Sequence, residues 1–144
     1  MLSFKNDIMP IFRSNCAKPG ACHNDPSTYT TAAGGGGRPY LGTAIDGGAE
    51  TMADIGIVYQ GLMKPSLEYK TPQINYVKGC DPAMSFLMLK MDPSFTTLDM
   101  SHCVHGDFSG FCGLPMPSDS TTGSLPQATR DMVRNWISQG AMNN

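Results

Sequence analysis

Two cysteines and a histidine near the amino end of the chain are spaced so that they could hold a porphyrin. Cys22 follows Cys16 after five intervening residues, and His23 comes directly after Cys22. Covalent haem attachment needs two thiols that reach the two vinyl groups, and an imidazole next to the second thiol as an iron ligand. The usual spacer between the thiols has two residues, so the longer spacer departs from the pattern at Cys16. Pro19-Gly20 within the spacer favours a turn that lets the extra residues loop outward.

A methionine between two prolines lies near the carboxyl end. Met116 stands between Pro115 and Pro117, shortly after Cys112. Proline fixes φ and lacks a backbone N–H, so this segment can neither join a helix nor flex much. A thioether sulfur held in this way is a soft sixth ligand for a haem iron, and it raises the reduction potential relative to two imidazoles. We therefore expect His23 and Met116 to be the axial ligands.

In their order along the chain, these motifs resemble those of the single-haem class I c-type cytochromes, and among them the bacterial domains called planctomycete-type cytochrome c. The resemblance spans nearly the whole chain and rests on short pieces: the entry helix at residues 4–12, Cys22-His23, Gly79-Cys80-Asp81-Pro82 before Ser85-Phe86-Leu87, Cys112-Gly113 before Pro115-Met116-Pro117, and a closing helix with Trp136-Ile137 and Gly140-Ala141. It implies an all-α, cytochrome c-like fold with about four helices around one haem and long irregular loops. It also implies one haem c, attached through Cys16 and Cys22.

Hydrophobic periodicity predicts where those helices lie. We expect them at residues 4–12, 50–62, 81–91 and 125–141. Ser3 and Asp81 are the expected N-caps of the first and third, and Ser124 begins a capping box before the last. Residues 24–48 and 92–111 have no clear period and predict irregular loops, and the first of these could cover the haem edge on the histidine side.

Most of the eleven methionines are expected to be packing residues. Met84, Met88 and Met91 have helical spacing, and Met132 lies on a face of the last helix. Trp136 of that helix is expected to be a core anchor rather than an electron relay. The resemblance implies that the last helix crosses the first, where the natural partners are Phe4, Ile8 and Phe12.

Length and composition indicate one domain that covers residues 1–144. The chain has 16 glycines and 11 prolines, so it has limited apolar surface of its own, and a haem would complete its core. The net charge of −2 argues against nucleic-acid binding, which favours a basic surface. No apolar run approaches the roughly 18 residues that a membrane span needs.

Five cysteines in a chain of this length point to an export compartment, such as the bacterial periplasm, the cell surface or the extracellular medium. If two of them carry haem, Cys80, Cys103 and Cys112 remain, and an odd number cannot all pair. We favour a disulfide between Cys103 and Cys112, which would clamp the segment that carries Met116. Cys80 with Cys112 is the alternative pair.

Two other haem arrangements stay open. The two remaining histidines, His102 and His105, lie in a polar loop, and ligation by His105 in place of Met116 would give a bis-histidine haem protein of lower potential. If the sixth ligand is labile or absent, the same scaffold could bind small ligands or reduce peroxide.

Readings without haem are also possible. A zinc module would use some of Cys16, Cys22, His23 and the later cysteines, but the only close pair, Cys22 and His23, is adjacent and makes a poor chelate. A disulfide-stapled secreted binding domain without a cofactor, in which Cys16 pairs with Cys22, leaves the bracketed Met116 without a purpose.

The function that these features favour is that of a single-electron carrier. With both axial positions of one haem filled, the iron has no open site for a substrate, so we expect a carrier and not an enzyme, either on its own or as a subunit of an oxidoreductase complex. Its partners would be donor and acceptor redox proteins that dock through small, transient surfaces.

Overall fold

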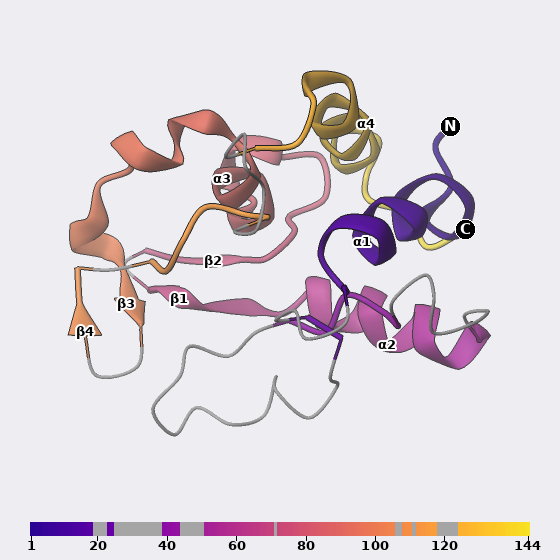
Figure 1. Cartoon of the computed structure of the whole chain (residues 1–144), viewed down its shortest axis with the longest axis horizontal. Helices are drawn as coiled ribbons and strands as arrows, with labels where there is room; N and C mark the ends of the chain where they lie inside the picture. Colours follow the sequence, from indigo (N-terminus) through magenta and orange to yellow (C-terminus); the bar gives the residue numbers. More distant parts are fainter. Residues whose placement is uncertain are drawn as a thin grey trace.

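The described part of the chain contains four α-helices and two small antiparallel hairpins (Figure 1). A computed structural model describes residues 1–18, 23–24, 39–43, 51–70, 72–105, 108–110, 112–117 and 124–144. The helices and strands within these ranges are α1 (Met9–Asn15), α2 (Met52–Leu62), β1 (Pro65–Lys70), β2 (Gln73–Asn75), α3 (Phe86–Met91), β3 (Val104–His105), β4 (Phe108–Ser109) and α4 (Gln127–Ser138). A π-helical turn, Phe4–Ile8, leads into α1, and 3₁₀ turns cover Pro82–Met84, Pro93–Thr97 and Met100–His102.

The expected all-α, cytochrome c-like class is wrong, because the fold mixes helices with antiparallel strands. β1 pairs with β2 in one hairpin, and β3 pairs with β4 in a second one. An isolated bridge between Tyr69 and Cys103 links the first hairpin to the start of the second. The strands follow α2 and the last 3₁₀ turn, in a part of the chain where periodicity predicted no regular structure or an irregular loop.

β1 has polar side chains on its buried face. Ser66 and Glu68 are buried, whereas Leu67 and Tyr69, which alternate with them, are only half-buried. The Ser66 hydroxyl accepts the backbone N–H groups of Glu68 and Tyr69, both at 3.1 Å, which satisfies it inside the protein. This alternation is the reverse of the apolar-inside pattern by which strands are predicted, so periodicity could not reveal it.

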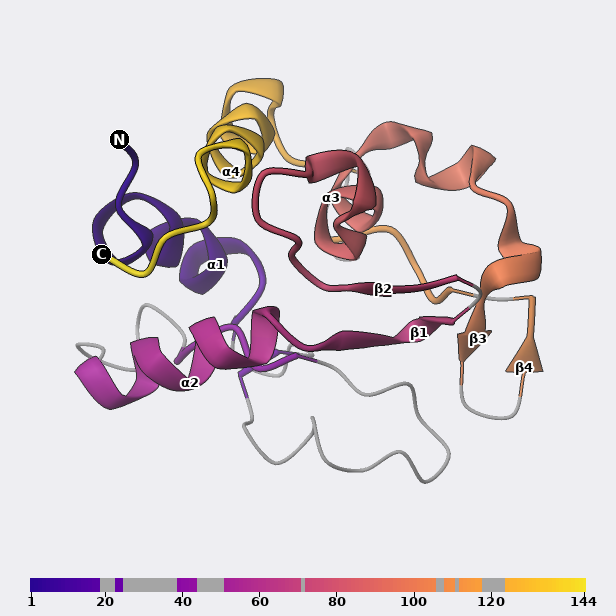
Figure 2. The same ribbon diagram turned by 180° about the vertical axis from the view of Figure 1, so that it is seen from behind.

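The amino-terminal helical segment packs against α4 (Figure 2). Phe4 stacks on Trp136 with ring centroids 5.1 Å apart, and it meets Tyr59 of α2 edge-on at 5.4 Å. Phe4, Trp136, Ile8 and Phe12 are all fully buried. The predicted packing of the last helix on the first is therefore confirmed. Burial of an apolar side chain of this size contributes about 1.5–3 kcal/mol.

A glycine lets the turn before α3 touch the end of α4. A Cβ on Gly79 would lie 2.8 Å from the carbonyl oxygen of Gly140, closer than real Cβ contacts come. The next residue, Cys80, has φ 65°, and its N–H donates to the Ile137 carbonyl at 2.8 Å. These contacts join the segment that leads into α3 to α4.

The helices α2 and α4 begin in different ways. Thr51 and Asp54 form a reciprocal capping box at the start of α2, which is worth about 1 kcal/mol in such sites. α4 begins at Gln127, and its N-cap residue is Pro126, with φ −50° and ψ 143° and no side-chain cap. The capping box predicted from Ser124 is therefore wrong, because the proline occupies the N-cap position.

The third helix begins later than predicted, and two of the four methionines that were assigned to the core are exposed. The Asp81 carboxylate accepts the N–H of Met84, so the predicted cap exists, but it caps the preceding 3₁₀ turn and not the α-helix. Met88 and Met91 are buried, as expected. Met84 and Met132 are each 39% exposed, so their assignment to the core is wrong.

Candidate functional site

Cys16, the first predicted haem anchor, lies at the C-terminal end of α1. Its N–H donates to the Phe12 carbonyl at 2.7 Å, which continues the helical hydrogen bonds to Cys16, the C-cap residue of α1. Cys16 and the neighbouring Ala17 are both buried. The second predicted anchor, Cys22, lies outside the described residues. The structure therefore places one of the two thiols in the interior, at the end of a helix that packs in the core.

His23 is buried and is held by two hydrogen bonds to one short segment. Its Nδ1 lies 2.8 Å from the Pro39 carbonyl oxygen, and its own carbonyl accepts the N–H of Leu41 at 2.8 Å. Because a carbonyl can only accept, Nδ1 carries the proton, and the neutral ring then has its lone pair at Nε2. Histidines that ligate metals commonly have this arrangement, with the second ring nitrogen donating to a backbone carbonyl or a carboxylate.

Residues 39–43, which hold His23, are themselves attached to α1. The Arg13 Nε donates to the Thr43 carbonyl at 2.8 Å, and Tyr40 and Leu41 are buried. Figures 1 and 2 both show residues 39–43 beside α1 and α2. α1 therefore supports Cys16 directly and His23 through residues 39–43. Residues 39–43 belong to the predicted loop 24–48, of which residues 25–38 and 44–48 lie outside the described residues; the expected cover over a haem edge stays a prediction.

Met116, the predicted sixth ligand, lies on residues 112–117, which we call the strap. The strap runs beside α3 (Figure 1), and the N–H of Met116 donates to the Lys90 carbonyl of that helix at 2.8 Å. Gly113 has φ 73°, a left-handed conformation that glycine adopts without strain, and so lets the strap turn after Cys112. Hydrogen bonds thus attach the two predicted ligands to different parts of the fold, His23 to the α1 side and Met116 to α3.

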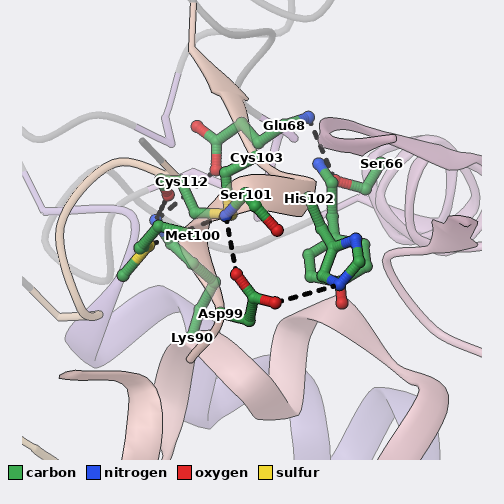
Figure 3. The surroundings of a disulfide bond; sticks show 10 residues. Ser66, Glu68, Lys90, Asp99, Met100, Ser101, His102, Cys103 and Cys112 are labelled. Carbon is green, nitrogen blue, oxygen red and sulfur yellow. Dashed lines mark hydrogen bonds and ion pairs between the residues drawn. A yellow bond between two sulfur atoms is a disulfide. The ribbon is translucent and has the colours of Figure 1, made fainter. Parts of the chain in front are cut away.

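The amino end of the strap is joined to Cys103 by a disulfide (Figure 3). This is the pair that the cysteine count favoured, and both cysteines are fully buried. Cys80, the alternative partner of Cys112, is an exposed free thiol. The strap is therefore clamped where it begins, four residues before Met116.

A buried ion pair between Lys90 and Glu68 supports the strap. Neither residue was predicted from the sequence. The Lys90 Nζ donates to the Cys112 carbonyl and lies 3.4 Å from a carboxylate oxygen of Glu68, with both side chains about nine-tenths buried. Burial lowers the pKa of Lys90, and the Glu68 carboxylate partly opposes this shift. The signal was present in the sequence: Lys90 is the one charged residue in the apolar run of α3, Phe86–Met91.

Two other histidines, His102 and His105, could rival Met116 as the sixth ligand. His102 is one-third exposed; its Nε2 lies 3.4 Å from the Asp99 carboxylate, and its ring lies beside that of Tyr69 at 5.5 Å. His102 is therefore engaged at the surface, as Figure 3 shows. His105 belongs to β3, where its backbone pairs with Phe108.

The described ranges contain neither a helix that could span a membrane nor a cluster of metal-ligating side chains. No helix there is long and apolar enough to cross a bilayer, and no three His, Cys, Asp or Glu side chains converge there as a metal site. No family model, no curated protein and no solved structure matches the chain.

Proposed function

We propose that the chain carries single electrons on one covalently attached haem c. The observation that carries this proposal is the hydrogen bond from the His23 Nδ1–H to the Pro39 carbonyl. It fixes the buried ring in the tautomer that offers Nε2 to a metal, and it increases the basicity of that nitrogen. A buried histidine directly after a cysteine, with its ring fixed in this way, fits the fifth ligand of a haem iron.

The chain would bind the haem through four residues. Cys16 and Cys22 would form the thioether bonds, while His23 and Met116 would be the axial ligands. When bound, such a haem supplies a ferric/ferrous couple whose potential depends on its axial ligands and surroundings. The Met116 thioether would favour the reduced state, and residues 39–43 would keep the histidine in place during each change of charge.

The protein would then be a carrier and not an enzyme, since both axial positions would be filled by its own side chains. Electrons would pass to and from redox partner proteins during brief encounters, as a free carrier or as a subunit of an oxidoreductase. Covalent haem attachment and the Cys103–Cys112 disulfide both suit the periplasm or the outer surface of a bacterium.

The direct test is whether colour stays with the polypeptide. The chain is produced in a bacterial periplasm that attaches haem to cysteines, then denatured and extracted with acidified organic solvent. We expect the haem spectrum to remain with the protein, and Cys22→Ala to lose most of it. Cys80→Ser is the matched control, because its thiol is exposed and unpaired. A colourless wild-type chain would contradict the proposal and favour the cofactor-free, disulfide-stapled domain.

A second comparison identifies the axial ligands. We expect His23→Ala to abolish stable haem incorporation, whereas His102→Ala, at the exposed histidine, leaves it unchanged. We expect Met116→Leu to open the sixth position to carbon monoxide, with Met142→Leu as the control at an exposed methionine. If His105→Ala opens the site and Met116→Leu does not, the protein is a bis-histidine haem protein. Rapid carbon monoxide binding by the wild type would instead favour a ligand-binding haem protein.

A further inference from the structure

We infer that Lys90 is the positioning residue of the strap and that it holds Met116 where its sulfur can act as the sixth ligand. The inference rests on the proposed haem ligation and adds a residue to it. Lys90 belongs to α3, contacts the strap at two places, and was not among the residues that sequence analysis selected.

The side chain and the backbone of Lys90 bind the two ends of the same short segment. Its Nζ donates to the carbonyl of Cys112, the first residue of the strap, and its carbonyl accepts the N–H of Met116 at 2.8 Å. Because both bonds come from one residue, the strap cannot shift along α3 without breaking at least one of them. Between the two bonded positions Leu114 is 58% exposed and Pro115 is half-buried, so the large side chains there do not anchor the strap by full burial.

The surroundings of Lys90 keep its ammonium group aimed at the strap (Figure 3). The Glu68 carboxylate reaches it from β1 at 3.4 Å, and the rings of Phe95 and Phe86 lie 4.8 Å and 5.7 Å from Nζ. The Lys90 side chain is only 7% exposed. It therefore has few alternative rotamers and little access to water that could replace its partners. A buried ammonium without these partners would be strongly unfavourable.

Polar support of this kind is directional in a way that apolar packing is not. A hydrogen bond from a charged donor is short and depends steeply on angle, so it fixes the Cys112 carbonyl in one orientation. Together with the Cys103–Cys112 disulfide, it defines the position from which the strap runs toward Met116. Loss of the bond from the Lys90 side chain should therefore loosen Met116 more than it loosens the rest of the protein.

The test compares haem-loaded wild type with Lys90→Met and with the double variant Glu68→Gln/Lys90→Met, in which no unpaired charge is left inside. Lys78→Met is the matched control, because Lys78 forms an exposed ion pair with Asp81. The readouts are the near-infrared charge-transfer absorption of methionine bound to ferric haem, the reduction potential, and the rate of carbon monoxide binding by the reduced protein. The free energy of unfolding is measured in parallel.

We expect both Lys90 variants to keep covalent haem, to weaken the charge-transfer absorption, and to have a lower potential. Carbon monoxide binding should be faster by about tenfold or more, since the loss of a hydrogen bond to a charged group changes an equilibrium by that order. Lys78→Met should match the wild type. A purely structural role would lower the free energy of unfolding and leave these three haem readouts unchanged.

The outcomes separate this inference from the proposed function. If the wild type shows methionine ligation and the double variant keeps the same absorption, potential and carbon monoxide rate, Lys90 does not position the ligand, and the carrier function stands. If the wild type holds no haem, both fail.

A measurement on the wild type alone guards against variants that do not fold. Amide hydrogen exchange should show the Met116 N–H protected to within about tenfold of the Asp92 N–H, which closes the last turn of α3 on Met88 at 2.9 Å. Fast exchange at Met116 beside a protected α3 would overturn the inference.

Discussion

Two contacts in this protein are stabilised by different interactions, one by apolar packing and the other by buried polar groups and a disulfide. Where the amino-terminal helical segment meets α4, the contact is apolar and centres on the stacked rings of Phe4 and Trp136. Where the strap meets α3, the contact is made by a buried lysine, a carboxylate and a disulfide. The first contact gains free energy from any well-packed apolar surface, whereas the second depends on each polar partner being present. The helical contact therefore supplies stability, and the strap contact supplies position.

The largest expected effect falls on the helical contact. Trp136→Ala removes a fully buried indole that stacks on Phe4 and donates from Nε1 to the Met142 carbonyl. We expect the free energy of unfolding to fall by about 3–5 kcal/mol, as for other large-to-small core changes. Chemical denaturation followed by circular dichroism measures it. Ile57→Ala, at a position that is 48% exposed, is the control, and a similar loss in both variants would contradict the central role of this contact.

The next effect falls on the strap. The disulfide closes a short loop, with a sequence separation of 9 between its cysteines. Replacing both cysteines by alanine should lower the free energy of unfolding by about 2–3 kcal/mol in the chain-entropy account. Cys80→Ser should change it little, because Cys80 forms no disulfide. Denaturation curves of the two variants that coincide with that of the wild type would show that the strap does not need its clamp.

Two glycine-to-alanine changes, one next to α4 and one in α2, should shift the free energy of unfolding in opposite directions. Gly79→Ala would force a methyl group to within 2.8 Å of the Gly140 carbonyl oxygen, and we expect a loss of about 1–3 kcal/mol in the free energy of unfolding. Gly56→Ala lies in α2 with open space around it and should instead add up to about 1 kcal/mol through helix propensity. Thermal and urea denaturation should give opposite signs for the two variants; a shared sign would contradict the close approach of the two backbones.

The smallest effect is the pH dependence that Lys90 contributes. Burial lowers its pKa below the ordinary 10.5, against the opposing effect of Glu68. Between the lowered pKa and 10.5 the unfolded chain binds more protons than the folded one, so this group's contribution to stability rises with pH in that window. The wild type should therefore gain stability relative to Glu68→Gln/Lys90→Met as the pH rises from neutral toward 10.5. A difference between them that stays flat would show that Lys90 keeps an ordinary pKa.

The same contrast explains how much of the fold could be predicted from the sequence. The spacing of Phe4, Ile8 and Phe12 predicted a helix with one buried face, because apolar residues at a 3.6-residue period report burial on one face. That the last helix packs on this face was implied by the family resemblance. β1 was missed because its buried positions carry Ser66 and Glu68, so its alternation has the wrong polarity. The all-α class failed for that reason, since a strand with a polar inner face has no signature in hydrophobicity alone.

The candidate site was predictable to a similar degree. Met116 and the Cys103–Cys112 pair stood out by residue type and spacing, and the structure adds Pro39 and Lys90 as the groups that hold His23 and the strap. These supports could not be predicted from local spacing because their partners are distant in sequence: 16 residues separate His23 from Pro39, and 22 separate Lys90 from Cys112. The haem itself stays a prediction.

The exposed thiol of Cys80 offers a practical route into these questions. It lies on a left-handed turn, and the Cys80 N–H donates to the Ile137 carbonyl at the end of α4. A spin label or a gold electrode attached there would have a defined orientation. With the proposed haem iron as the second paramagnetic centre, a label at this single point would let the label-to-iron distance be followed while the redox state is changed.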